Sequence, residues 1–571
     1  MQKSDSAANL DRQVLQEARQ RGSLAMLGAF VRLSGPGWLQ SAITLGGGSL
    51  AGALYLGVIG GYSLLWAQLL AIVFGVIMLC AISYATLSTG ERPFHAINRH
   101  VNPVLGWGWA LATLVANMVW CLPQFSLATA AVQQNLLPDV VGAESSLGGD
   151  YGRYPICAVL LAVAVGVVLL YDSGRRGVRI FEAVLKTMVA IVVLSFFGVV
   201  LRLAFSGDGL PWSEIFAGFV PNLNTWSEPA AAFAPYLAAV DESVRGFWRD
   251  QIIGIQRNVM IAAVATAVGI NMTFLLPYSM LRRGWDREFR GMAIFDLSTG
   301  MALPYLLVTT CVVIASAGRF HAHAEQTLLD PQASPPANLV GDYESLLNKR
   351  LDQSSAAKPD DGAAESEGER AERLAAQREA LPEADKQLAA MIVRRDAFNL
   401  AQALSPLTGA TVANFVFGVG VLGMALSTII ILMLISGFVF CEILGFEPGG
   451  AAHRWGSMAP AVGVLGPFVW SKAQFWLAVP TSVFGMALLP IAYITFLLMM
   501  NSASLLGADR PQGGKRFIWN LLMVTAASFA TAAAGWSVWS KVSWYGVAGV
   551  AAFLGLAVVV HLVRKTRPAE S

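Results

Sequence analysis

Charged residues are scarce in this sequence. Only 13% of its 571 residues are Asp, Glu, Lys or Arg, whereas 55% are hydrophobic and the mean hydropathy is +0.56. This composition excludes an ordinary water-soluble domain and indicates a polytopic membrane protein.

Other absences narrow the class of protein further. The sequence has no G-x-x-x-x-G-K-[ST] loop for nucleotide phosphates and no basic-aromatic signature for nucleic acid. We therefore expect no enzyme, no cofactor, no nucleic-acid partner and no nucleotide-binding subunit. The five cysteines all lie in or at the ends of apolar runs, which argues against a disulfide framework. A channel or secondary transporter in a lipid bilayer, with a small ion or solute as substrate, remains.

Long apolar runs are abundant instead. A helix needs ~20 apolar residues to cross the roughly 30 Å hydrocarbon core of a bilayer. Runs of that kind predict an all-α protein with about 11–12 transmembrane helices. The predicted spans are 34–60, 62–88, 104–123, 155–172, 178–203, 252–282, 291–316, 408–440, 456–474, 476–501, 516–539 and 543–564.

Positive charge is concentrated in every second loop of this arrangement, and the intervening loops are short or lean acidic. The positive-inside rule therefore predicts a multi-pass protein of the cell (inner) membrane with both termini in the cytoplasm. The polar N-terminus lacks the form of a cleavable signal. The basic residues are Arg12, Arg19, Arg21 and Arg32, then Arg92 and Arg99, Arg175, Arg176 and Arg179, Arg282, Arg283, Arg287 and Arg290, Arg454, Lys515 and Arg516, and finally Arg564, Lys565 and Arg567.

The chain divides into a membrane domain with one large insertion. The charged insertion is predicted to lie outside the cell, with a disordered first half and an exposed helix over 366–396. It is either a docking or gating element or a tolerated surface insertion. The predicted segments are 1–32 (cytoplasmic), 33–320 (spans one to seven), 321–396 (the insertion), 397–564 (spans eight to twelve) and 565–571 (cytoplasmic tail).

Two predicted spans are interrupted near mid-membrane, the first at "ITLGGGSL" (43–50) and the sixth at "AVGINMTFLLP" (267–277). Pro277 removes a helical hydrogen bond in the sixth span. In lipid, broken helices are tolerated only where they line a cavity or are covered by protein. Two breaks five spans apart predict an inverted repeat whose breaks meet at a midplane substrate site. The glycines at the breaks are Gly46, Gly47, Gly48 and Gly269.

A second explanation for the glycines is close helix packing, for which the spacing of Gly48 and Gly52 is suitable. However, three adjacent glycines spread over all faces of a helix, which packing does not require. We therefore favour a broken helix.

Five stretches resemble, in order, the divalent-metal transporters of the Nramp family. This resemblance covers nearly the whole membrane part and implies the LeuT-type inverted-repeat fold with broken helices 1 and 6. The stretches are "GPGWLQSAITLGGGSLAGALYLGVIGGYSLLW" (35–66), "LSTGERPFHAINRH" (87–100), "GRRGVRIFEAVLKTMVAI" (174–191), "AIFDLSTGMALPYLLVTTCVVIASAGRFH" (293–321) and "LSPLTGATVANFVFGVGVLGMALSTIIILMLISGFVFCEILGF" (404–446).

The resemblance also implies where the family's metal site falls, and this chain departs from it. The family's Asp, Pro and Asn in the first span fall on Gly46, Gly47 and Ser49. Its metal-contacting Met is present as Met272, but the His that usually follows is Phe274.

Two further spans also depart from the family. The carboxylates of the third span have no counterpart, since this chain has Pro123, Gln124 and Ser126 there, and the Gln of the tenth span matches Val483. The site has lost its charge.

Residue chemistry therefore conflicts with the resemblance. A divalent ion favours oxygen ligands, preferably carboxylates, and isolated charge in a low dielectric is costly. The site offers Gly carbonyls, Ser49, Asn271 and the thioether of Met272. Met272 is either a ligand or a core residue, and Asn271 and Gln124 either line the cavity or bond between helices.

Two acidic residues near span ends are candidates for gating. Asp296 could latch onto Arg290 or a neighbouring arginine, or could stabilise a helix start. Glu182 and Lys186 are four residues apart and are expected to form a salt bridge along one helix.

Together these features predict a secondary transporter that works by alternating access at a midplane site. The resemblance favours a metal cation as its substrate. The alternatives are a neutral or zwitterionic organic solute on the same fold, or a non-transporting receptor or scaffold whose function depends on the 321–396 insertion.

Overall fold

The computed structural model describes residues 2–142, 145, 148–173, 175–205, 209–335, 337–355, 367–469 and 477–566. Within these residues all regular secondary structure is helical, as the sequence predicts. Nine helices of this part are long and apolar enough to cross a bilayer, and one bent pair adds a tenth.

The spanning helices follow the predicted order. They are the bent pair α3 (Pro36–Thr44) and α4 (Gly47–Gly60), then α5 (Leu65–Thr89), α7 (Pro103–Ala130), α9 (Gly149–Asp172), α10 (Arg175–Ala204), α13 (Glu242–Ala267) with α14 (Ile270–Arg282), α15 (Arg290–Asp296) with α16 (Leu303–Phe320), α22 (Ala410–Leu444), α25 (Ala478–Asn501) and α27 (Gly513–Thr566). Six-residue π-helical segments extend α7 (Ala131–Leu136) and join α15 to α16 (Leu297–Ala302).

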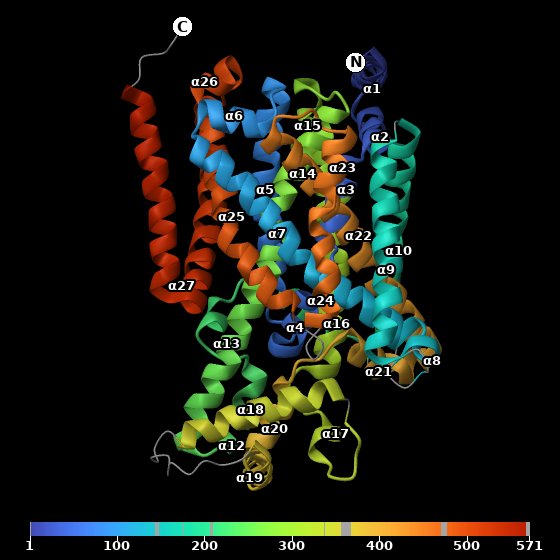
Figure 1. Ribbon diagram of the computed structural model, residues 1–571, viewed down its shortest axis with the longest axis vertical. Coiled ribbons are helices and arrows are strands. Elements are labelled where there is room, and N and C mark those ends of the chain that lie inside the picture. The colour runs from blue at the N-terminus through green and yellow to red at the C-terminus, as the bar shows by residue number, and fades with distance from the viewer. Residues whose placement is uncertain are drawn as a thin grey trace.

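The last of these helices, α27, supplies two crossings. Its 54 residues would extend about 80 Å as one straight rod, far more than a bilayer core. At Ser543 the backbone leaves the helical region, with φ 54° and ψ −138°, and the two arms run back alongside each other (Figure 1). These arms are the two final spans that the sequence predicts.

The ninth predicted span, 456–474, differs from the prediction. Its described part is a succession of α23 (Gly450–Ser457), a 3₁₀ segment (Ala459–Leu465) and α24 (Gly466–Val469). Pro460 and Pro467 donate no backbone hydrogen bonds, and Gly463 and Gly466 lie against the backbone of α7. Apolar composition alone therefore predicts a regular helix over a stretch whose described residues form only short helical pieces.

The broken helices form the centre of the molecule. In the most apolar stretches of α13–α14 and of α22, 89% of residues are buried inside the protein, against 6% in α27. Helices α9 and α10 also have apolar side chains on their outer faces, as lipid-facing helices do. The breaks are thus covered by protein.

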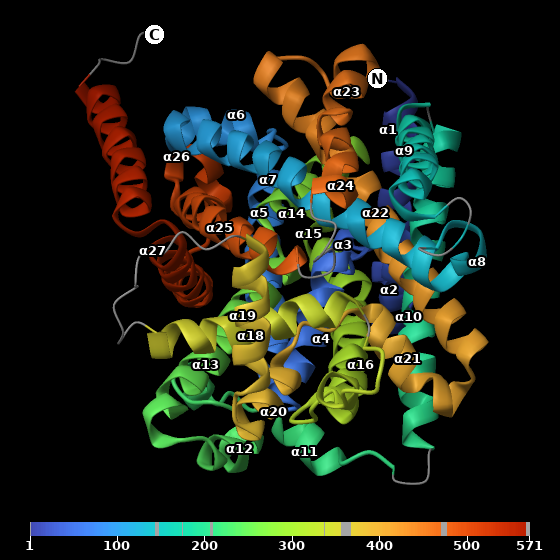
Figure 2. The ribbon, with the colours of Figure 1, turned by 60° about the horizontal axis from the view of Figure 1, so that its bottom comes forward.

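The insertion is folded in its described part, which corrects the expectation of a disordered first half. Residues 356–366 lie outside the described residues. The insertion lies at the end of the molecule opposite the N- and C-termini, and α18 runs across that end (Figures 1 and 2). Its helices are α17 (Gln326–Leu329), α18 (Ala337–Ser355), α19 (Glu367–Glu379) and α20 (Glu383–Ile392).

Helix α20 is not the exposed helix that its composition suggests. Leu388, Met391 and Ile392 are buried, and Asp385 accepts a hydrogen bond from the indole of Trp248 on α13 at 2.5 Å. The guanidinium of Arg350 on α18 also pairs with Asp385 at 3.0 Å. The insertion is therefore fastened to the membrane domain by a buried polar cluster.

Shorter helices complete the chain. They are α1 (Gln2–Arg21), α2 (Ser23–Leu33), α6 (Pro93–His100), α8 (Pro138–Val141), α11 (Trp212–Ala217), α12 (Ala234–Ala239), α21 (Ala397–Thr408) and α26 (Ala503–Leu506).

Candidate functional site

The first helix break lies where the glycine run predicts it. Helix α3 ends at Thr44, α4 begins at Gly47, and the two are bent by 53°. Gly46 is extended (φ −88°, ψ 174°), and a Cβ there would lie 2.4 Å from Oγ1 of Thr428. Only glycine permits this approach of α22 to the unwound backbone.

The second break lies at Val268 and Gly269, between α13 and α14. Pro277 lies inside α14 and does not interrupt it, so the expectation that Pro277 helps to break the sixth span was wrong. Its missing N–H removes one hydrogen bond, and the fully packed flanks of α14 hold the helix together around it. The extended backbone at Val268 and Gly269 ends α13 instead.

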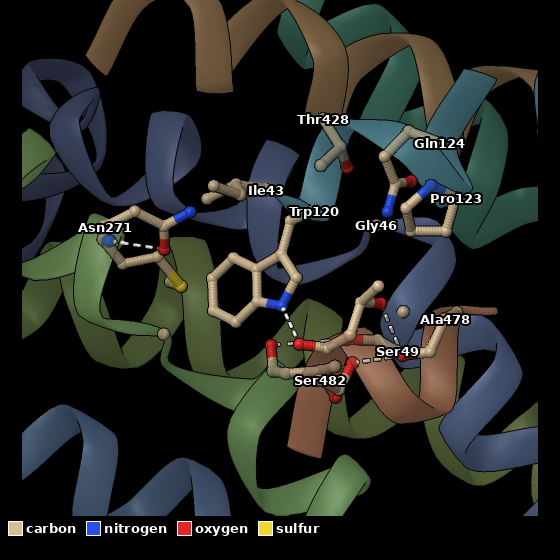
Figure 3. A pocket seen from close by; sticks show the side chains of 15 residues that line it. Ile43, Gly46, Ser49, Trp120, Pro123, Gln124, Asn271, Thr428, Ala478 and Ser482 are labelled. Atoms are coloured by element: carbon tan, nitrogen blue, oxygen red, sulfur yellow. Dashed lines mark hydrogen bonds between the residues drawn. The ribbon is translucent and has the colours of Figure 1, made fainter. Parts of the chain in front are cut away.

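A cavity of about 30 Å³ lies between the two breaks (Figure 3). A cavity needs roughly 10–15 Å³ to hold one water molecule, so this one has room for about two particles of that size. The residues that line it are Ile43, Gly46, Gly48, Ser49, Trp120, Pro123, Gln124, Thr266, Gly269, Asn271, Met272, Thr428, Ala478, Thr481 and Ser482.

Seven of the eight predicted site residues line this cavity. The exception is Gly47, whose N–H donates to Oε1 of Gln124 at 3.0 Å and so ties α4 to α7. The sequence interpretation left open whether Gln124 lines the cavity or bonds between helices, and it does both.

Ser49 and Met272 link the two broken helices. The Ser49 hydroxyl donates to the Thr44 carbonyl at 2.5 Å and lies 3.4 Å from the carbonyl of Thr266. The Met272 sulfur accepts from Oγ1 of Thr44 at 3.5 Å, and the Met272 carbonyl accepts from Nε2 of Gln40 at 3.0 Å. Met272 is therefore both a packed residue and a face of the cavity.

Asn271 is completely buried at the start of α14. Its Oδ1 accepts from the backbone N–H of Met272 at 2.9 Å, whereas its Nδ2 has no hydrogen-bond partner. Figure 3 shows this nitrogen facing the cavity.

Trp120 is a lining residue that the sequence interpretation missed, as it missed Ile43, Thr266, Thr428, Ala478, Thr481 and Ser482. Its indole lies in the middle of the lining, and its Nε1 donates to the Thr481 carbonyl at 2.8 Å (Figure 3). A Cβ on Gly269 would come within 2.2 Å of this ring, and one on Gly485 within 2.0 Å. The ring therefore lies in a slot between Gly269 and Gly485. The sequence signal for this slot is this pair of glycines on two distant spans.

The polar lining is uncharged. The hydroxyls of Ser49, Thr428 and Ser482 each donate to a backbone carbonyl of their own segment, at 2.5, 2.8 and 2.5 Å. Their oxygen lone pairs remain available to the cavity. Among the described residues, no group of three or more His, Cys, Asp or Glu side chains could hold a metal ion.

Asp296 lies at the end of α15 and caps the start of α3. Its carboxylate accepts from the Gly37 N–H at 2.6 Å, the Gly35 N–H at 3.2 Å and the Ser34 hydroxyl. Arg290 pairs with Asp509 at 2.9 Å instead of with Asp296, so there is no latch to Arg290, and the helix start that Asp296 stabilises is that of α3 and not that of its own span.

Glu182 pairs with Arg283 at 2.5 Å, which corrects the expected pair with Lys186. Arg283, which directly follows α14, reaches Glu182 because α14 and α10 both pack against α3, and it also donates to the Leu33 carbonyl at 3.2 Å. Lys186 points instead to the Ser34 carbonyl at 3.3 Å. All these groups hold the N-terminal end of α3, on the side of the molecule that carries both termini (Figure 1).

Two discontinuous helices around a midplane cavity define the class of protein as a helical membrane protein of the LeuT-type fold. The sequence profile of the natural resistance-associated macrophage protein-like (Nramp) family matches residues 37–334 and 386–540. Because the match covers most of the chain, the protein belongs to the Nramp family.

Similar proteins agree with this assignment. The chain is 30% identical over 164 residues to "Metal transporter Nramp2" of Arabidopsis thaliana, a match that covers 28% of each chain. It is 25% identical over 169 residues to "Metal transporter Nramp6.2" of Populus trichocarpa, covering 30% of this chain and 28% of the other. The matched segment thus spans about 28% of the length of these curated relatives.

The fold is also found in solved structures. Crystal structures of mutant forms of the Eremococcus coleocola manganese transporter match 94% of this chain and 95% of their own, with a TM-score of 0.59 and 13% identity. At that identity the likeness establishes the fold alone.

Proposed function

We propose that this protein is a secondary transporter of a small metal cation, which binds in the cavity between the two helix breaks and crosses the membrane by alternating access. The observation that carries the proposal is the pair of breaks facing one cavity, because unwound backbone inside a membrane is tolerated only where it lines a cavity or is covered by protein, and two breaks on one cavity are the arrangement of a transporter's substrate site. The names of the curated relatives, which are metal transporters, support a metal as the substrate.

In this proposal the cation meets oxygen lone pairs and a thioether instead of carboxylates. Ser49 and Met272 are its contacts from the two broken helices, and Asn271 contributes from the start of α14. The site is atypical of its family because the position of the family's metal-binding Asp is Gly46. A hydrated ion held by hydroxyls and carbonyls, or a softer ion that uses Met272, suits these ligands best.

The capped end of α3 is the proposed inner gate. Asp296 on α15 accepts a hydrogen bond from the first turn of α3. Glu182 on α10 pairs with Arg283, which lies beside the same end of α3. Releasing it would let α3 move independently of α4 around the break at Gly46. With the termini in the cytoplasm of the inner membrane, as the basic loops predict, this gate faces the cytoplasm and the insertion faces outward.

A neutral or zwitterionic organic solute is the second candidate, favoured by the absence of formal charge in the described lining of the cavity. The volume of about 30 Å³ argues against it, because even a small amino acid exceeds two water-sized bodies.

Uptake into proteoliposomes tests the proposal. The purified protein is reconstituted and screened with divalent metals and with small organic solutes, and Met272→Ala and Ser49→Ala serve as site variants. We expect Mn²⁺ or a softer ion to enter only vesicles that contain protein, and both variants to slow its entry. Equal metal flux in empty and protein-containing vesicles would falsify metal transport.

A further inference from the structure

The cavity contains a hydrogen-bond donor that a cation cannot satisfy. Nδ2 of Asn271 faces the cavity without a partner, although Asn271 is completely buried. The amide orientation is fixed, because the opposite one would set the NH₂ group against the N–H of Met272. A buried donor without an acceptor costs about 1–3 kcal/mol, and only an electron-rich ligand can recover this.

Two helix N-termini supply positive potential at the same place. Helix α4 (14 residues) and helix α14 (13 residues) both begin at the cavity, with Gly46 and Gly269 as their N-cap residues. The Gly47 N–H already donates to Gln124 and the Met272 N–H to Asn271, so the two helix starts act on an anion through their potential and not through these two N–H groups. Each helix start is equivalent to roughly +0.5 of an elementary charge. Such ends bind anions. The amide nitrogen of Gln124 faces the same space (Figure 3).

Other lining atoms suit a cation. The hydroxyl oxygens of Ser49, Thr428 and Ser482 turn their lone pairs to the cavity, because their hydrogens are donated to carbonyls. The cavity therefore offers acceptors and donors side by side, with no formal charge of its own.

Charge balance connects these observations. A cation alone in an uncharged, buried cavity is left uncompensated, which is costly in a low dielectric. A small anion beside it would provide the negative charge that a carboxylate would otherwise supply. The volume of about 30 Å³ has room for two water-sized bodies, hence for one cation and one small anion.

We propose that the midplane site binds its cation together with a small monovalent anion of halide size, and that Nδ2 of Asn271 and the first turns of α4 and α14 hold this anion. The inference rests on the proposed function for the identity of the cation. The contacts to the anion are set by this chain's own donors.

Anion replacement tests the inference. Mn²⁺ uptake by proteoliposomes is measured in chloride and in gluconate, which is too large for the cavity, at equal ionic strength. We expect uptake to be lower in gluconate by roughly 5- to 150-fold, the usual range for coupled ligands. Equal uptake in the two salts overturns the inference and leaves metal transport intact.

A variant that carries its own negative charge sharpens the test. Asn271→Asp places a carboxylate where the anion is proposed to bind, so its uptake should be similar in chloride and gluconate. Asn258→Asp on α13 is the matched control, because it adds the same charge outside this cavity, and it should keep the chloride requirement. If Asn271→Asp keeps the full chloride requirement while folded, the anion is not held at Asn271 and the inference fails.

Thermal unfolding separates the two proposals. The detergent-solubilised wild-type protein should unfold at a higher temperature in chloride than in gluconate, because a ligand of the folded state stabilises it. Identical unfolding temperatures contradict the anion site even if Asn271→Asp does not fold. Conversely, if chloride stabilises the protein but no metal enters the vesicles, the anion site stands and the metal proposal fails.

Discussion

Trp120 determines the shape of the cavity at the scale of single residues. The indole is held by the Thr481 carbonyl and lies in a slot between Gly269 on one broken helix and Gly485 on α25. Neither glycine can be enlarged without moving a rigid ring. The slot therefore sets how much space is open between the two helix breaks.

Replacing Gly485 by Ala should destabilise the protein. The new Cβ would lie 2.0 Å from Cζ2 of Trp120, and such overpacking costs typically 1–3 kcal/mol. The measurement is thermal unfolding in detergent. Gly535→Ala on α27 is the control, because no atom lies within 4 Å of its added Cβ, and it should be neutral or slightly stabilising.

A second substitution tests whether the clash with Trp120, and not a general effect on α25, causes the loss of stability. Replacing Trp120 by Leu in the Gly485→Ala protein removes the clashing ring, so the double variant should regain part of the lost stability. If the effects of the two substitutions on the free energy of unfolding simply add, Trp120 and residue 485 do not touch, and the ring does not lie in a slot beside Gly485.

Asp296 is the second residue whose role follows from its contacts. Its carboxylate caps α3, and Asp296→Asn removes the negative charge at that helix start, which is worth about 1–2 kcal/mol where the site is partly buried. We expect backbone amides of Pro36–Thr44 to exchange hydrogen faster in the variant, while those of α5 are unchanged. Asp139→Asn makes the same change at an exposed helix start and should leave α3 unaffected.

At the scale of helices, the sequence is informative about where they lie and less so about what they contact. Apolar length and basic loops place the spanning helices, and the glycine run at 46–48 marks the first break. Pro277 suggests a break that does not occur, because a packed helix tolerates one missing hydrogen bond. The partner of Glu182 could not be predicted, since Arg283 lies 101 residues away and reaches it only because α14 and α10 pack against the same helix, α3.

The junction between α16 and α4 contains a titratable contact. His321 follows α16 directly, and its Nδ1 donates to the Val58 carbonyl at 3.1 Å, close to the ring of Phe233. Burial lowers the pKa of His321 below the ordinary value of 6.5, and the neighbouring His323 acts in the same direction, although the Val58 carbonyl opposes both.

This contact should therefore loosen in acid. Because the folded state binds the proton less readily than the unfolded chain, the stability that His321 contributes is complete above about pH 6.5 and is lost as the pH falls through the pKa of the folded state. Hydrogen exchange at residues 57–61, corrected for intrinsic rates, should be faster at pH 5 than at pH 7.5. His323→Gln should keep this pH effect and His321→Gln should remove it; the reverse pattern would assign the effect to His323.

At the scale of the whole molecule, two arrangements could not be seen in the sequence. The stretch 456–474 is predicted to be a span because it is mainly apolar and long enough, yet in its described part prolines and glycines against α7 produce short helical pieces. The charge-rich insertion has the composition of an exposed segment, yet α20 is buried among α12, α17 and α18, and its Asp385 finds both Arg350 and Trp248. The composition of a segment indicates only how polar the segment is on average. Whether it forms a regular helix or is buried depends on a few specific contacts.

The buried cluster around Asp385 predicts how the insertion is attached. The side chains of Asp385 and Arg350 are only 1% and 9% exposed, and removing one partner of a buried ion pair typically costs about 3–5 kcal/mol. Asp385→Ala should therefore break the link between α20 and Trp248 of α13 and loosen α20, seen as faster proteolysis and faster hydrogen exchange within 383–392. Glu379→Ala removes an exposed carboxylate from the same insertion and should change neither. Unaltered protection of α20 in Asp385→Ala would mean that its apolar face alone, with Leu388, Met391 and Ile392, attaches the insertion to the membrane domain.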